Sequence, residues 1–202
     1  MNLHTILTKA KLSEKEVVAV YVYGSRVYGN ITKQSDYDFI VVTTNKVNKQ
    51  FSDNLININF YTPEEHQQRL DEHEISAIEC QFLDSQFILL EKRKFSFNID
   101  NTKLRYSLRA KSSNSWVKAK KKLTVEKDYD LSLGRKSLFH AMRIIEYGIQ
   151  LAEKGKIYDY GCCNLLFEEI MNKYDWSELF LTYKNRYNNL LTRFRVVAPK
   201  EI

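Results

Sequence analysis

Residues 17–43 read VVAVYVYGSRVYGNITKQSDYDFIVVT, and this stretch decides the fold. It opens with an unbroken β-branched and aromatic run, Val17–Tyr23, which is typical of a strand buried on both faces and stops at Gly24. A second apolar run over residues 38–43 repeats the pattern. The sequence therefore predicts two buried strands, joined by a short helical turn that begins Gly-Ser and by a segment that ends Asp-Tyr-Asp.

The rest of the first half also mixes helix and strand signals. Residues 3–12 have apolar side chains at helical spacing, and residues 55–61 alternate apolar and polar side chains like a strand with one less buried face. Thr62-Pro63-Glu64-Glu65 forms a capping box that opens a helix to about residue 72. Two further elements are predicted: a helix over 75–83 and a strand over 87–90.

The second half contains no strand-like run and few helix-breaking residues, so we expect it to be helical. The predicted helices cover 103–122, as one helix or a pair, 131–153, 165–171 and 176–192. The sequence thus predicts an α+β fold. A small mixed β-sheet domain over residues 1–95 is followed by a basic α-helical bundle over residues 96–202.

Composition bounds the class of protein. The chain has 202 residues, of which 44% are hydrophobic and 13% aromatic, so a disordered chain is excluded. Three cysteines form neither a disulfide framework nor a CxxC metal pattern, which indicates a reducing compartment. Because no apolar run approaches the roughly 18 residues that span a bilayer, we expect a cytoplasmic protein without a membrane segment.

The positive charge is concentrated in the second half. The first hundred residues carry 11 Lys and Arg against 14 Asp and Glu, net −3, whereas residues 101–202 carry 20 against 11, net +9. Residues 103–122 hold eight Lys and Arg and no acid, which favours a phosphate-binding surface at least as much as a solvated helix face. Within this run, Tyr106 and Trp116 either stack on a nucleic-acid base or anchor the helix on its bundle.

The segment between the two strands carries the residues for chemistry. Asp36 and Asp38 are two apart, so in an extended chain their carboxylates lie on one face, where their oxygens suit hard cations such as Mg²⁺. Gly24 permits close approach of a ligand to the backbone, and Ser25 offers a hydroxyl and an N–H group to a phosphate. A phosphate clamp beside a metal pair suits phosphoryl or nucleotidyl transfer. The alternative is a solvated turn without function.

Together, these residues closely resemble a family signature. Gly-Ser, ten residues, then Asp-x-Asp after an apolar strand is the signature of the DNA polymerase β-like nucleotidyltransferase superfamily. The GSRxxG…SDxDF form looks most like the small stand-alone nucleotidyltransferases. The motif covers residues 17–43, similarity over 55–90 is looser, and the remainder resembles the helical domains, some of them HEPN-like, that such enzymes append.

The resemblance implies a role for each motif residue. Gly24 and Ser25 would bind the phosphates of an NTP, which we expect to be ATP, and Arg26 either reaches a phosphate oxygen or is an exposed loop residue. Asp36 and Asp38 would be the catalytic residues and would bind Mg²⁺ or Mn²⁺.

One departure from the family concerns the third carboxylate, which usually lies on a later strand. The inward polar positions of the matching strand here are Asn57 and Asn59, and asparagine is neutral and cannot act as a base. Three explanations stay open: Asp53 or Glu79 supplies the carboxylate, the site works with two acids, or the domain binds nucleotide without turnover.

The second half adds further candidates. Arg135 and His140 have the R-x₄-H spacing of HEPN domains, some of which cleave RNA, but a substrate-binding bundle is the better interpretation. The predicted substrate-binding residues are Lys118, Lys120, Lys121, Lys136, His140 and Arg143. We treat the remaining histidines as surface residues and the cysteines as fillers of a core or interface: His4, His66 and His73, and Cys80, Cys162 and Cys163.

The function predicted from the sequence is metal-dependent transfer of NMP from an NTP to an acceptor hydroxyl, with an RNA 3′ end as the acceptor that fits the basic half best. A protein hydroxyl, as in antitoxin-type AMP transferases, and a small alcohol such as an aminoglycoside are alternatives; aminoglycosides are cationic, so the basic bundle counts against them. A non-enzymatic alternative is a nucleotide- or RNA-binding module with a weak site. The sequence does not set the oligomeric state.

Overall fold

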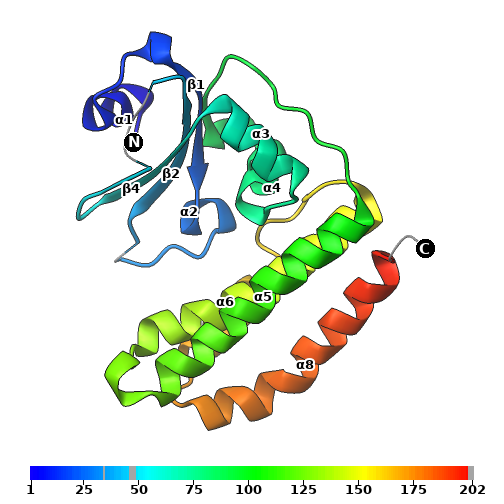
Figure 1. Ribbon diagram of the computed structural model, residues 1–202. Coiled ribbons are helices and arrows are strands. Elements are labelled where there is room, and N and C mark those ends of the chain that lie inside the picture. Colours follow the sequence, from blue (N-terminus) through cyan, green and yellow to red (C-terminus); the bar gives the residue numbers. More distant parts are fainter. Residues whose placement is uncertain (34, 46–48, 200–202) are drawn as a thin grey trace. The chain divides into compact units, whose positions relative to one another are not determined.

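The computed structural model describes residues 1–33, 35–45 and 49–199, which fall into two compact units, Met1–Asn98 and Ile99–Ile202. The first unit contains a five-stranded sheet with helices, and the second is helical (Figure 1), so the predicted α+β fold is confirmed. No helix of the described residues is long and apolar enough to cross a membrane. The strands are β1 (Val17–Tyr23), β2 (Tyr37–Thr43), β3 (Gln50–Ser52), β4 (Ile56–Tyr61) and β5 (Ile88–Glu91).

The sheet has the strand order β3-β4-β2-β1-β5. β2 and β4 are parallel, and every other pair is antiparallel. Because β1 and β2 are antiparallel, the end of one meets the start of the other, and Tyr23 pairs with Asp38. Because β2 and β4 are parallel, their starts lie side by side, and Asp38 pairs with Asn57. One edge of the sheet therefore collects the polar ends of β1, β2 and β4.

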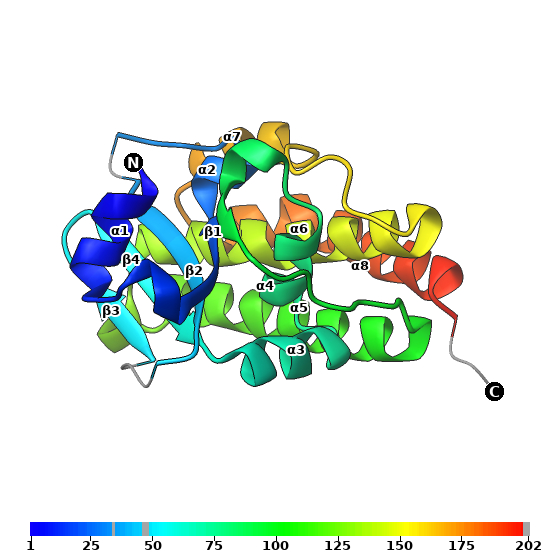
Figure 2. The same ribbon diagram turned by 90° about the horizontal axis from the view of Figure 1, so that it is seen from above.

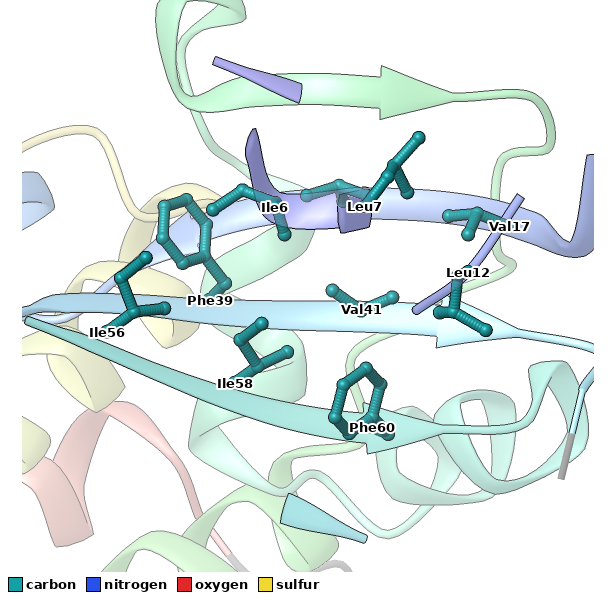
Figure 3. Packing of buried hydrophobic residues seen from close by; sticks show 10 residues of the cluster. Ile6, Leu7, Leu12, Val17, Phe39, Val41, Ile56, Ile58 and Phe60 are labelled. Carbon is teal, nitrogen blue, oxygen red and sulfur yellow. The ribbon is translucent and has the colours of Figure 1, made fainter. Parts of the chain in front are cut away.

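Helices cover both faces of this sheet. Figure 3 shows Ile6 and Leu7 of the first helix facing Phe39, Ile56 and Ile58 in an apolar cluster on one face. Alternate residues of β4 point the other way, toward the face on which the third helix packs. The helices of this unit are α1 (Leu3–Ala10), α2 (Ser25–Tyr28), α3 (Pro63–Asp71) and α4 (Ile75–Gln81), with short 3₁₀ turns η1 (Glu14–Glu16) and η2 (Ser85–Phe87).

The second unit is a helical bundle in which α5, α6 and α8 pack along one another (Figures 1 and 2). Its elements are α5 (Asn101–Thr124), η3 (Glu126–Asp128), α6 (Leu131–Lys154), α7 (Asn164–Met171) and α8 (Trp176–Val197). Buried Ser112 of α5 donates to the carbonyl of Ala141 at 2.7 Å and lies 2.8 Å from the Tyr187 hydroxyl. Trp116 stacks on Tyr187 with ring centroids 4.4 Å apart, so it anchors α5 in the bundle.

Some sequence-based expectations were wrong. The short strand β3 was not predicted, because Phe51 is its only apolar residue. His66 and His73 are buried rather than at the surface, because aromatic side chains pack against them: Tyr21 and Phe95 against His66, and Phe97 against His73. Of the three cysteines predicted to fill a core or an interface, Cys80 and Cys163 are buried, whereas Cys162 is exposed and does not fill the core.

Candidate functional site

Gly24 lies against the carboxylate of Asp38. It ends β1 with φ 78° and ψ −151°, a backbone conformation that is almost restricted to glycine. A Cβ atom built on Gly24 would lie only 2.3 Å from Asp38 Oδ2. The glycine is therefore required by the sheet register, which sets the Asp38 carboxylate directly over the backbone at the Gly-Ser turn.

Asn57 joins the two aspartates of the motif. Its side-chain amide donates through Nδ2 to Asp36 Oδ2 and, at 3.2 Å, to Asp38 Oδ1. Its Oδ1 accepts a hydrogen bond of 2.5 Å from the Ser52 hydroxyl of β3. The structure thus brings Gly24, both aspartates and Asn57 into one contiguous polar group. Sequence reasoning missed Ser52, because the β3–β4 pairing that delivers it was not predicted.

Ser25 and Arg26 begin α2, directly after Gly24. Ser25 is half-buried at the first helical position. The guanidinium of Arg26 lies 3.4 Å from the centre of the Tyr37 ring and donates to the Ser35 carbonyl at 3.2 Å. Arg26 therefore holds the segment that leads into Asp36.

The other candidates for a third carboxylate occupy different surroundings. Asp53 pairs with Lys9 and accepts from the backbone N–H groups of Leu55 and Ile56 in the β3–β4 turn, and the Lys9 hydrogen bond is the main cause that lowers its pKa. Glu79 of α4 is buried and accepts a 2.8 Å hydrogen bond from Tyr28. Asn59 lies two residues beyond Asn57, on the same face of β4.

The donor set fits a divalent cation. Asp36 and Asp38 already share an electropositive partner, the Asn57 amide nitrogen, and two adjacent carboxylates supply the hard oxygen ligands that Mg²⁺ and Mn²⁺ prefer. Among the described residues, no group of three or more His, Cys, Asp or Glu could hold a metal ion. A cation here would therefore bind to two acids.

In the bundle, the predicted substrate-binding residues separate into different surfaces. His140 Nδ1 lies 2.9 Å from the guanidinium of buried Arg143, and the pKa of His140 is held well below its usual value by burial and by the charges of Arg143, Lys111 and Lys118. Lys118 thus lies close to this pair. By the helical period, Lys120 points about 160° away from Lys118, whereas Lys121 lies only about 60° from it; both are exposed, as is Lys136.

Arg135 and His140 do not act as a pair. The Arg135 side chain donates to the Lys173 carbonyl and lies over the Tyr174 ring at 4.8 Å, whereas His140 contacts Arg143. The two residues of the R-x₄-H spacing therefore have separate partners within the bundle, and this weakens the alternative of a HEPN-type nuclease.

Comparison with known proteins identifies the first unit. The sequence model of the nucleotidyltransferase domain family matches residues 6–98. Among curated proteins, none matches the sequence significantly. A similar solved structure is spectinomycin adenyltransferase AAD(9) from Enterococcus faecialis with ATP and spectinomycin, with 13% identity, a TM-score of 0.48 and 96% of each chain covered.

Another similar structure is a nucleotidyltransferase-like protein from Exiguobacterium sibiricum 255-15, with 15% identity and a TM-score of 0.33, covering 96% of this chain and 72% of the other. The family is established by the match to residues 6–98, which contains the whole Gly-Ser and Asp-x-Asp site. Residues 6–98 are a nucleotidyltransferase domain of the DNA polymerase β-like superfamily, and the chain that carries them is a nucleotidyltransferase.

Proposed function

We propose that this enzyme transfers NMP from an NTP, with ATP the donor to test first, to the 3′ hydroxyl of RNA, and that the transfer depends on a divalent cation held by Asp36 and Asp38. One observation carries the proposal. The two carboxylates lie beside the Gly-Ser turn and share an electropositive partner, the Asn57 amide, which is the arrangement that a cation bound to a triphosphate needs.

Each group of site residues has a separate role in the proposed reaction. The acceptor oxygen forms a bond to the α-phosphorus. The bond between the α-phosphorus and the oxygen that bridges to the β-phosphate breaks, and pyrophosphate leaves. Bound Mg²⁺ or Mn²⁺ would neutralise the leaving group and favour the alkoxide form of the acceptor. Backbone and hydroxyl groups at Gly24 and Ser25 hold the triphosphate. Because Asn57 cannot act as a base, the hydroxyl proton passes to an aspartate or to water.

The charge of α5 supports RNA as the acceptor. This helix carries eight Lys and Arg and no acid, and six of the eight side chains are exposed. Tyr106 is 81% exposed and lies on the outer face together with Arg109 and Lys120, so this face offers an aromatic ring for stacking and cations for phosphates. A cationic small alcohol would be repelled by this surface.

The acceptor is tested with [α-³²P]ATP and short RNAs that end in either a 3′ hydroxyl or a 3′ phosphate. We expect label on the first RNA only, because the phosphate blocks the nucleophile. Label on both RNAs or on neither, or label on protein bands of a lysate instead, contradicts an RNA 3′ end as the acceptor.

Salt dependence tests the surface that holds the RNA. For a single strand, log K falls against log salt with a slope of about −0.7 per phosphate contact. Replacing Arg109 and Lys120 together with Glu should therefore make the slope shallower by about 1.4. The matched control reverses two exposed lysines outside α5, Lys154 and Lys156, with the same change in net charge. Equal effects of the two double variants would contradict a binding role for α5.

A further inference from the structure

The Asn57 amide occupies carboxylate lone pairs of Asp36 and Asp38 that a bound cation would use. Its amide nitrogen donates to one oxygen of each aspartate, Asp36 Oδ2 and Asp38 Oδ1. The hydrogen bond from Ser52 to Asn57 Oδ1 fixes the orientation of the amide, because the oxygen is turned toward β3 and the nitrogen toward the carboxylates.

The register of the sheet places Asn57, and not Asn59, beside the carboxylates. In the parallel register, Asn57 lies beside Asp38, whereas Asn59 lies beside Ile40. Two residues along a strand correspond to about 7 Å, so Asn59 is on the same face but displaced from the carboxylates. Among the described residues, the hydrogen bonds to the two aspartates include two from Asn57, one to each carboxylate, and none from Asn59.

We propose that Asn57 sets the cation affinity of the site: its amide competes with the cation for the two aspartates, and it stands where a third carboxylate would complete the ligand set. The inference rests on the proposed cation-dependent function. It identifies Asn57, rather than Asn59, Asp53 or Glu79, as the position that replaces the third acid. Asn57 acts as a positioning residue, because it orients both carboxylates and limits how tightly they hold a cation.

The test is Mn²⁺ binding to the full chain, measured by isothermal titration calorimetry. Asn57→Asp exchanges a competing donor for an anionic ligand, so we expect Mn²⁺ to bind at least about tenfold more tightly than to the wild type. Asn59→Asp adds the same charge on the same strand and face, and its affinity should rise by about threefold or less, since the added carboxylate lies farther away.

Thermal unfolding gives a second readout. Three carboxylates at one place repel, so Asn57→Asp should unfold at a lower temperature than Asn59→Asp in EDTA, and Mn²⁺ should remove that difference. A variant that folds only with Mn²⁺ supports the inference in the same way. A variant that fails to fold even with Mn²⁺ overturns it, because position 57 then does not accommodate a ligand.

Two other results would overturn the inference, and they differ in whether the proposed cation site is retained. If the wild type binds Mn²⁺ and the two Asp variants show equal affinity, the role of Asn57 is wrong and the cation site at the aspartate pair stands. If neither the wild type nor Asn57→Asp binds Mn²⁺ at millimolar concentration, the cation-dependent function falls together with the inference.

Discussion

The substitution Gly24→Ala tests how tightly the Gly-Ser turn is fitted to the aspartate pair. The added methyl group would lie 2.3 Å from Asp38 Oδ2 and 3.0 Å from Asp38 Cγ, so the carboxylate must move by about 1 Å to reach ordinary contact. The backbone at φ 78° and ψ −151° is itself unfavourable for alanine, at about 1–3 kcal/mol.

Both consequences can be measured. We expect the free energy of unfolding to fall by about 2 kcal/mol, and the rate of nucleotidyl transfer to fall by about 100-fold or more, because a displacement of this size disrupts the aligned groups of an active site. Urea denaturation reports the first quantity. Transfer of label from [α-³²P]ATP, measured with protein that is folded by circular dichroism, reports the second.

Gly155→Ala is the matched control. Gly155 also has a positive φ, 72°, but nothing lies within 4 Å of its built Cβ atom, and it ends α6 in the helical unit. Its replacement should cost about 1 kcal/mol of stability and leave the transfer rate unchanged. If Gly24→Ala transfers label at a rate within twofold of that of Gly155→Ala, the close packing of the turn on Asp38 does not matter for catalysis and the reasoning is refuted.

Two further predictions concern pH and packing. Burial lowers the pKa of His66 to about 4, so between pH 6.5 and 4 only the unfolded chain binds a proton at this residue. His66 should therefore leave the free energy of unfolding unaffected above pH 6.5 and lower it by about 3 kcal/mol as the pH falls to 4. Urea melts of His66→Phe should lack this loss of stability. Trp116→Ala should destabilise the chain by about 3 kcal/mol in urea melts, because Trp116 stacks on Tyr187 inside the bundle. Tyr106→Ala should change stability by under about 0.5 kcal/mol but weaken RNA binding about tenfold in filter binding, because Tyr106 is exposed. The reverse order in the two assays would contradict Trp116 as a bundle anchor and Tyr106 as an RNA contact.

Much of the fold was predictable because local patterns and the global fold agree. Val17–Tyr23 is a strand with the predicted bounds, since a β-branched run ending at glycine has few other solutions. The capping box at Thr62 also forms as predicted, with both of its hydrogen bonds. In contrast, β3 is held by pairing with β4, and a three-residue strand with one apolar residue has no periodicity to detect.

The site was predictable as a set of residues but not as a set of contacts. The Asp-x-Asp spacing suggested adjacent carboxylates, yet the bridge from Asn57 depends on the parallel register of β2 with β4, which no local pattern encodes. The burial of His66 is likewise a tertiary effect, since its own helix has few apolar residues. In α5, a count of charges could not separate Lys118, near His140, from Lys120 on the opposite side of the helix.

The most direct test of the central claim, that Asp36 and Asp38 hold the cation for nucleotidyl transfer, is label transfer from [α-³²P]ATP with Mg²⁺ or Mn²⁺ in single Asp→Asn variants. We predict that Asp36→Asn and Asp38→Asn each lose at least about 100-fold in rate while remaining folded, and that Asp84→Asn, at an exposed acid of the same unit, keeps the wild-type rate. Unchanged transfer in both site variants, or equal loss in all three, would contradict the account.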